Sequence, residues 1–161
     1  MEKLNALRKI LKNRKIDALL VTQPENRRYL SSYSATDSSI AETSGVLLIP
    51  RSGTPLLLTD SRFELHAGDE AKGFEVLLYP KGLLALLQKL LPKMAVKRLG
   101  FESHYILHST AGKLTAITDK LGVEAVPLVG LVEKMRLRKE QEEIEKIEKS
   151  VLLNEQVFQE V

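Results

Sequence analysis

Short apolar runs alternate along the first 130 residues with segments of helical periodicity, and this alternation most constrains the fold. The apolar runs predict strands at 16–21, 45–49, 55–59, 74–79, 97–101 and 123–126, and the periodic segments predict helices at 2–13, 61–71, 82–91 and 108–120. Residues 50–54 contain Gly53 and are suited to a hairpin, so the second and third strands are expected to be antiparallel. The pattern predicts an α/β sandwich on a mixed sheet.

Three helix boundaries carry local signals. Thr22 and Glu25, with Pro24 between them, have the spacing of a capping box and predict a short helical turn over 26–30. Ser61 and Glu64 form a second candidate box at the start of 61–71. Pro92 is expected to stop the leucine-rich helix over 82–91.

The sequence changes character after Gly130. Residues 1–130 carry a net charge of +5 and residues 131–161 a net charge of −2. Leu137, Ile144, Val151 and Phe158 recur every seven residues among charged side chains, which predicts one long C-terminal helix. We therefore expect a domain over 1–130 and a linker with a helix over 131–161, its apolar stripe docking against another domain.

Composition excludes several classes of function. The chain has 0 Cys, which removes disulfides, thiolate metal sites and cysteine nucleophiles, and favours a cytoplasmic location. A net charge of +3 with 0 Trp, 4 Phe and 4 Tyr gives no support for nucleic-acid binding. The longest apolar runs are too short for a signal core or a membrane span, so no membrane partner is expected.

Common catalytic and cofactor motifs are also missing. Gly112 and Lys113 lack the preceding glycine of a phosphate-binding loop, and neither a dinucleotide-binding glycine motif nor a nucleophile elbow is present. His104 and His108 have the spacing of a zinc pair, but Tyr105 replaces the general-base glutamate, so two surface histidines are the favoured interpretation. His66 is likewise expected to be a solvated histidine.

Two polar segments remain as candidates. The turn at Asp60, Ser61 and Arg62 could present an acid and a cation to a ligand, but helix capping by Ser61 with local pairing of Asp60 and Arg62 is favoured. Residues 31–44 have no periodicity and predict a long polar loop, the best candidate for a binding segment. Its candidate site residues are Tyr33, Asp37, Ser38, Ser39 and Glu42. A merely flexible connection is the alternative.

The order and spacing of several short motifs resemble one family. They are the segments Asp17-Ala18-Leu19-Leu20-Val21, Pro24-Glu25-Asn26 with Tyr29-Leu30, Leu58-Thr59-Asp60-Ser61-Arg62-Phe63, Leu99-Gly100-Phe101-Glu102, and Met135-Arg136-Leu137-Arg138-Lys139 with Glu142, Glu143 and Ile144. Together they look like the N-terminal domain of Xaa-Pro aminopeptidases, prolidases and creatinases, together with the entry to the family's pita-bread catalytic domain. Ser32 before Tyr33, and Phe63 where tyrosine is common, depart from the family pattern and leave the subfamily open.

The resemblance implies a ribonuclease H-like α/β sandwich and a division of labour. In this family the bond before proline is hydrolysed by two divalent metal ions (Mn, Co or Zn), held by two Asp, one His and two Glu of the catalytic domain. None of these five ligands can be assigned to residues of this chain, so we expect no catalytic residue, no metal ligand and no activity from it alone. The N-terminal domain is implied to build a homodimer and to send a loop to the rim of the partner's active site. By position, that loop is the segment from Tyr33 to Glu42, with Asp37 nearest the substrate and Tyr33 as an apolar wall.

Three functional hypotheses follow. The first is the non-catalytic domain of a cytoplasmic Xaa-Pro aminopeptidase or Xaa-Pro dipeptidase, whose substrates are proline-containing peptides. The second is a catalytically inactive module of the same architecture that binds peptides or proteins. The third, creatine-type amidinohydrolysis, has no sequence feature that favours it.

Overall fold

The computed structural model describes residues 2–160; Met1 and Val161 lie outside it. The elements in chain order are α1 (Glu2–Asn13), β1 (Ala18–Val21), α2 (Pro24–Ser31), β2 (Val46–Pro50), β3 (Leu56–Thr59), the short 3₁₀ helix η1 (Ser61–Phe63), α3 (Glu64–Glu70), β4 (Glu75–Leu78), α4 (Leu83–Lys93), β5 (Arg98–Glu102), α5 (His108–Lys120), β6 (Glu124–Leu128), α6 (Leu131–Leu137) and α7 (Gln141–Glu160). The chain divides into two compact units, Met1–Gly130 and Leu131–Val161, and each is described separately.

The first unit is built on one six-stranded sheet, which confirms the predicted α/β fold on a mixed sheet. The strand order is β4-β3-β2-β1-β5-β6. The predicted hairpin is present, with β2 and β3 antiparallel in the register Val46 to Leu58. Strand β1 is antiparallel to β2 but parallel to β5, and the β3–β4 and β5–β6 pairs are also parallel. The sheet is therefore parallel at both ends and antiparallel in the middle.

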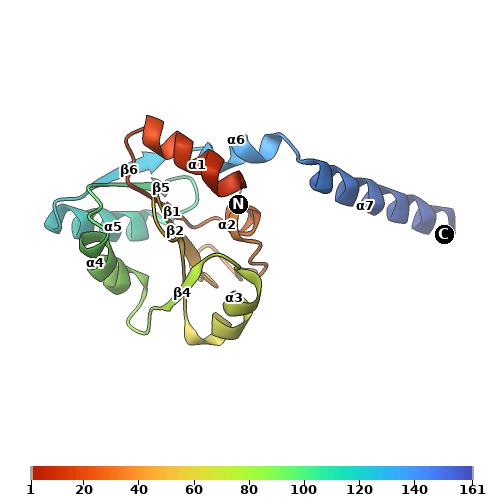
Figure 1. The fold of residues 1–161 in the computed structure, drawn as a ribbon. Helices are drawn as coiled ribbons and strands as arrows, with labels where there is room; N and C mark the ends of the chain where they lie inside the picture. Colours follow the sequence, from red (N-terminus) through yellow and green to blue (C-terminus); the bar gives the residue numbers. More distant parts are fainter. Residues whose placement is uncertain (1, 161) are drawn as a thin grey trace. The chain divides into compact units, whose positions relative to one another are not determined.

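Helices cover both faces of this sheet, with α4 and α5 on one side and α1, α2 and α3 on the other (Figure 1). Successive residues of a strand point to opposite faces, so β1 serves both layers. Ala18 and Leu20 belong to the cluster that includes Leu87 of α4 and Leu114 of α5. The alternate residues Leu19 and Val21 are equally buried. Burial on both faces explains why the strands read as continuous apolar runs instead of an alternating pattern.

Gly100 in the centre of β5 marks a tight approach between the sheet and its neighbours. A Cβ atom built there would lie 2.7 Å from Leu128 Cδ1, 3.2 Å from Ile16 Cγ2 and 3.3 Å from Leu19 Cδ1. Three side chains would have to move at once, because the interior is closely packed. Glycine is therefore required at position 100 because there is no room for a side chain, and not because the backbone adopts a conformation that only glycine favours.

We predict that Gly100→Val lowers the free energy of unfolding by about 1 to 3 kcal/mol, the usual range for overpacking a core. The matched control is Gly112→Ala in the middle of α5, where an added Cβ meets nothing within 4 Å. This change should stabilise the chain by about 0.5 to 1 kcal/mol, because alanine is the better helix former. Urea unfolding of both variants checks the pair; equal effects of the two substitutions would contradict this view of β5.

The local signals for helix starts and stops predicted the structure less accurately than the apolar runs predicted the strands. The Thr22 and Glu25 capping box does not form: the residue at the N-terminus of α2 is Gln23, whose side chain makes no capping hydrogen bond. At the second candidate box, Asp60 and not Ser61 caps the chain, accepting a hydrogen bond from the Arg62 backbone N–H at 2.9 Å. The predicted helix over 61–71 is accordingly split into η1 and α3.

Pro92 does not stop α4. The helix continues through it to Lys93. A proline in the last turn leaves only one backbone hydrogen bond unmade. The chain turns instead at Ala95, which has a φ of 52°.

The second unit contains two helices where the sequence predicted one. Leu137 ends α6, so it does not share a helix with Ile144, Val151 and Phe158 of α7. The side chain of Lys139 caps the end of α6 by donating to the carbonyls of Arg136 (3.0 Å) and Leu137 (3.4 Å). The long C-terminal helix itself is confirmed, and its apolar residues are exposed.

A new helix start separates α6 from α7. The Glu140 backbone N–H donates to the carboxylate of Glu143 at 3.0 Å, which is half of a capping box. Capping at this point breaks the heptad pattern. Across residues 2–160, the structure contains no helix with the length and apolar character needed to cross a bilayer.

Candidate functional site

The predicted polar loop is present and connects α2 to β2 over residues 32–45; we call it the connecting loop. Ser32 ends α2 with a left-handed φ of 65°, and its backbone N–H donates to the carbonyl of Arg28. A single antiparallel bridge pairs Ser39 with Glu42 and closes the exposed loop tip, residues 38–42. The loop is long, and the side chains beneath it determine its shape.

Arg27 of α2 is the centre of that support. Its guanidinium is fully buried and donates to the backbone carbonyls of Ala35 and Gly45, to Ser44 Oγ at 2.8 Å and to Asp37 Oδ1 at 3.1 Å. These acceptors lie at both ends of the connecting loop. One rigid, forked donor therefore fixes the loop's two arms against each other.

Asp37 completes this network from the loop side. Its side chain is 4% exposed, and Oδ1 also accepts the Ser44 backbone N–H and Ser44 hydroxyl, both at 2.8 Å. Its charge is balanced by the guanidinium, as burial of a carboxylate requires. Asp37 thus holds the two arms of the loop together through Ser44 and Arg27.

Tyr33 is completely buried, so in this chain it offers no apolar wall to a substrate, contrary to the expectation from position. Its ring stacks beside the Arg27 guanidinium, 5.3 Å from the ring centroid, and its hydroxyl donates to the Ser44 carbonyl at 3.1 Å. Burial raises the pKa of the Tyr33 hydroxyl, which therefore remains a donor at neutral pH. The ring supports the loop from below.

The remaining candidates, Ser38, Ser39 and Glu42, all lie exposed at the loop tip. Ser38 Oγ donates to Glu42 Oε2 at 2.8 Å. Beside them, a shallow polar pocket of about 200 Å³ is lined by both arms of the loop and by Arg62 and Phe63. The Arg62 side chain is 71% exposed and pairs with Asp60 at 2.8 Å, which confirms their predicted local pairing and holds the pKa of Asp60 below its usual value. The tip therefore presents a carboxylate and a guanidinium together.

A second cluster, which the sequence did not suggest, anchors the start of the connecting loop to α3. Glu70 accepts the Ser34 backbone N–H at 2.6 Å and the Ser34 hydroxyl at 2.9 Å, and pairs with His66 Nε2 at 3.0 Å. His66 is thus engaged and not simply solvated as expected. The i, i+4 spacing of His66 and Glu70 on a predicted helix was the available signal. Ser34 and Glu70 meet the same imidazole nitrogen, so the three do not form a nucleophilic triad, which uses both ring nitrogens.

This cluster predicts an acid-dependent loss of stability. The Ser34 backbone N–H is the main cause that holds the pKa of Glu70 below its model-peptide value of 4.5. A depressed folded-state pKa contributes stability that is present above the unfolded pKa and is lost as pH falls through the folded pKa. We expect Glu70→Gln to be less stable than the wild-type chain above about pH 5, and this difference to shrink as pH falls from about 5 to 3. Urea unfolding at several pH values measures it; a difference independent of pH would contradict the role of Glu70.

His104 and His108 do not share a helix, so they lack the i, i+4 arrangement of a helical zinc pair. His104 lies in a turn, where its Nε2 is 3.1 Å from Gln23 Oε1, and His108 begins α5. Over the described residues, 2–160, no three His, Cys, Asp or Glu side chains gather closely enough to hold a metal ion. The donor set of this part of the chain therefore does not fit a two-metal centre.

A buried carboxylate, Glu102, connects the start of α2 to β5. The sequence analysis did not identify it as a site residue. Glu102 at the end of β5 accepts the backbone N–H groups of Thr22 (2.7 Å) and Gln23 (2.8 Å) and the Asn26 side-chain amide (2.7 Å). It thereby caps the N-terminus of α2, the helix that carries Arg27. The partners are about 80 residues apart in sequence, so no local pattern could reveal them.

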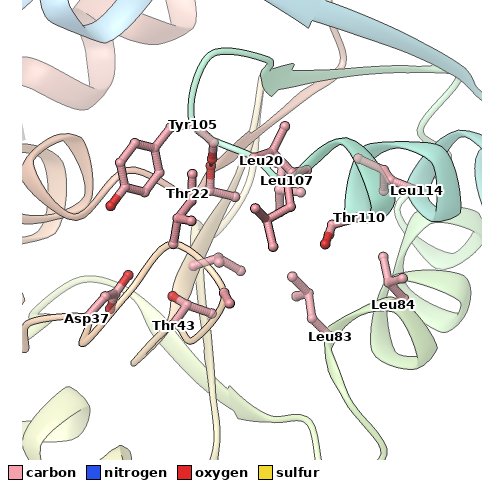
Figure 2. Close-up of a pocket in the computed structure, with 14 residues that line it drawn as sticks. Leu20, Thr22, Asp37, Thr43, Leu83, Leu84, Tyr105, Leu107, Thr110 and Leu114 are labelled. Carbon is pink, nitrogen blue, oxygen red and sulfur yellow. Dashed lines mark hydrogen bonds between the residues drawn. The ribbon is translucent and has the colours of Figure 1, made fainter.

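An apolar pocket of about 100 Å³ lies behind the loop tip, between the connecting loop and the N-terminal ends of α4 and α5. Figure 2 shows Leu83 and Leu84 of α4 facing Leu107, Thr110 and Leu114 across it. Asp37 and Thr43 border it from the loop.

Comparison with known proteins gives a consistent result. A family model described as the creatinase/prolidase N-terminal domain matches residues 3–138. The chain is 28% identical over 159 residues to an uncharacterized peptidase, YqhT, of Bacillus subtilis (strain 168), with 99% of this chain and 42% of that protein covered.

Comparison with solved structures gives the same result. An Xaa-Pro dipeptidase from Bacillus anthracis is 30% identical with a TM-score of 0.79, covering 90% of this chain and 38% of that one. The N-terminal domain of the cytoplasmic peptidase PepQ from Mycobacterium tuberculosis H37Rv is 26% identical with a TM-score of 0.72, covering 83% and 97%. The chain thus spans less than half the length of the two longer relatives.

Proposed function

Because this chain belongs to the creatinase/prolidase N-terminal domain family, we propose that it is the non-catalytic N-terminal domain of a proline-specific peptidase, an Xaa-Pro aminopeptidase or Xaa-Pro dipeptidase. In this proposal the whole peptidase acts in the cytoplasm on proline-containing peptides. It contributes to a homodimer and places the loop tip at the rim of the partner's active site.

The observation that carries the proposal is the rigid presentation of an exposed polar tip. The side chains of Arg27 and Asp37 are buried and hydrogen-bond to the two arms of the connecting loop, while Ser38, Ser39 and Glu42 are exposed. A loop with no partner to meet would not require a buried ion pair, because such pairs are costly to desolvate. A requirement to hold a surface loop in one position for binding explains why the desolvation of these two charges is tolerated.

Within this proposal the predicted site residues divide into two groups. Ser38, Ser39 and Glu42 form the surface that meets the peptide, with the Glu42 carboxylate opposite the peptide's amino terminus. A carboxylate suits that group because the resulting hydrogen bond is charge-assisted. Asp37 and Tyr33 lie beneath and act as positioning residues. Arg62, beside the same polar pocket, offers a guanidinium to a carboxylate of the peptide.

Metal chemistry is assigned elsewhere in this proposal. The two divalent ions expected for the family, Mn, Co or Zn, would be held by a catalytic domain, since the described residues provide no suitable donor set. This chain's residues orient and restrict the peptide. The metal ions, held by that catalytic domain, would supply Lewis-acid activation of water and of the scissile carbonyl.

The alternative is a catalytically inactive peptide- or protein-binding module. The feature that favours it is the polar pocket lined by both Glu42 and Arg62, because it offers a negative and a positive charge to the two ends of a short peptide. Calorimetric titration of the 161-residue chain with an Xaa-Pro peptide distinguishes the two. Micromolar binding without a catalytic domain supports the module, and a flat titration counts against it.

The experiment that tests the main proposal is a chimera. Residues 3–138 replace the matching part of the Bacillus anthracis Xaa-Pro dipeptidase, whose sequence is 30% identical. We expect the chimera to hydrolyse an Xaa-Pro dipeptide. Glu42→Gln within it should raise KM by about tenfold with kcat within about twofold, because a contact shared by the ground and transition states is lost.

The matched control is Glu75→Gln, an exposed glutamate of β4 at the opposite end of the sheet. It should leave both constants unchanged. An unchanged KM for Glu42→Gln in a folded chimera would overturn the proposed rim role.

A further inference from the structure

We propose that the apolar pocket behind the loop tip binds a small neutral ligand that combines a branched aliphatic group with one hydrogen-bonding group, an amide or a hydroxyl. This inference is independent of the proposed peptidase function. It concerns a separate pocket and is tested by binding alone.

The pocket lies where this type of fold most often binds ligands. Strands β1 and β5 are parallel neighbours, and their carboxyl ends meet here. The chain leaves β1 towards α2 on one face of the sheet and leaves β5 towards α5 on the other (Figure 1). A crevice at the carboxyl ends of parallel strands, where the connections diverge, is the usual ligand position in open α/β sheets.

The lining selects an aliphatic group. Leu20 and Val46 come from the strands, and Leu83, Leu84 and Leu107 come from the helix starts. The side chains of Leu20, Leu83, Leu84 and Leu107 lie around the space shown in Figure 2. The volume of about 100 Å³ is below the roughly 150 Å³ of a dry engineered cavity that binds benzene, so the pocket suits the branched aliphatic group of a ligand and not a larger ring.

Four hydroxyl side chains line the pocket. Two of them already donate hydrogen bonds within the protein, and the other two are available to a polar ligand group. Thr22 Oγ1 already donates to the Tyr105 carbonyl at 2.8 Å, and Thr43 Oγ1 donates to the Gly45 carbonyl at 2.7 Å. Within residues 2–160 the structure gives no hydrogen-bond partner to the hydroxyls of Thr110 and Tyr105. The Thr110 hydroxyl points into the pocket (Figure 2).

The electrostatics exclude a charged ligand. Among the described residues that line the pocket, Asp37 is the only one with a formal charge, and Arg27 balances it at 3.1 Å. A cation or anion entering the pocket would lose hydration without gaining a counter-ion. A neutral amide or alcohol loses less and gains the Thr110 hydroxyl.

Occupancy would also bear on the loop. Ile40, Ala41 and Thr43 of the connecting loop form one wall, and α4 and α5 form the other. A ligand between them contacts both walls, so it stabilises the loop in the observed position.

The test is a titration of the ¹⁵N-labelled 161-residue chain with isobutyramide, a neutral branched amide of suitable size, followed by NMR. We expect saturable shifts at the amides of Thr22, Leu107 and Thr110, with a Kd of about 1 to 10 mM. Acetamide, isobutyrate and isobutylammonium should each bind at least about tenfold more weakly, since acetamide lacks the branched group and the other two carry a charge.

Variants locate the site. Thr110→Val removes the hydroxyl while keeping the shape and should weaken binding about fivefold. Leu84→Phe fills the pocket and should abolish binding. Ser109→Ala removes a neighbouring exposed hydroxyl that does not line the pocket and should change nothing. The proposal is overturned if isobutyramide does not saturate, if the shifts lie elsewhere on the chain, if acetamide or the charged analogues bind as well, or if the folded Thr110→Val and Leu84→Phe chains bind like wild type.

Discussion

Replacing Arg27 with methionine is expected to lower the free energy of unfolding by about 3 to 5 kcal/mol, the usual cost of removing one partner from a buried ion pair. The substitution leaves the Asp37 carboxylate, 4% exposed, without its counter-ion. It also removes the donors to the carbonyls of Ala35 and Gly45 at the two arms of the connecting loop. Methionine keeps the contacts of the aliphatic stem of Arg27 but removes the guanidinium, so the loss reports on the polar contacts together with the space that the guanidinium filled. Urea unfolding of the 161-residue chain measures it.

The neighbouring Arg28 provides the control. It lies on the same helix but is exposed, and Arg28→Met should change stability by less than about 0.5 kcal/mol. The double variant Arg27→Met with Asp37→Leu should cost less than the sum of the two single changes, because the stranded carboxylate is then absent. Additive single effects would mean that the two residues do not act as a pair.

Replacing Glu102 with alanine is expected to lower the free energy of unfolding by a similar amount, about 3 to 5 kcal/mol. Three donors lose their acceptor: the backbone N–H groups of Thr22 and Gln23 and the side-chain amide of Asn26. Hydrogen bonds to a charged group contribute about 1.5 to 3 kcal/mol each, and these contributions are not fully additive. The N-terminus of α2 also loses the negative charge that favours it.

Glu124 on the adjacent strand β6 is the matched control. Its carboxylate is exposed and pairs with Arg98 at 2.8 Å. Glu124→Ala should lower the free energy of unfolding far less than Glu102→Ala, because exposed ion pairs contribute little to stability. If Glu102→Ala costs no more than Glu124→Ala in urea unfolding, Glu102 is not the cap of α2. Backbone exchange of the first turn of α2 provides a second measurement, with faster exchange expected in Glu102→Ala alone.

The strands could be predicted because a strand buried on both faces of a sheet needs an apolar side chain at nearly every position, which gives a continuous apolar run in the sequence. β1, β2 and β3 are buried along their whole length, and the predicted runs coincide with them to within two residues. The hairpin turn is short and local, so its antiparallel pairing could also be predicted. Order and spacing of motifs then identified the family, which the comparisons show.

For the candidate site, the sequence predicted which segment forms it but not which residues of that segment are buried. The loop's lack of periodicity located it, but which of its residues are buried depends on Arg27, which lies on a helix that reads as polar. Its neighbour Arg28 has the same chemistry and is exposed, so residue type alone could not separate them. Asp37 is the only acidic residue between 26 and 41, a charge complement that could have suggested the pair.

Long-range contacts account for the other differences. The cap of α2 comes from Glu102, far away in sequence, and the Ser34 contact with Glu70 joins a loop to a helix beyond the hairpin. The break between α6 and α7 depends on side-chain capping by Lys139 and Glu143, which interrupts a seven-residue repeat that would otherwise continue. Periodicity identifies a helical segment but does not reveal where capping divides it.

The most direct test of the central claim uses mixed dimers of the chimera with the dipeptidase. One subunit carries Glu42→Gln with an active catalytic domain, and the other carries the intact loop tip with a catalytic domain whose metal ligands are replaced. If the tip serves the partner's active site, the mixed dimer should recover the low KM of the unmodified chimera, although each parent homodimer is defective. A mixed dimer that keeps the raised KM of Glu42→Gln would contradict the account.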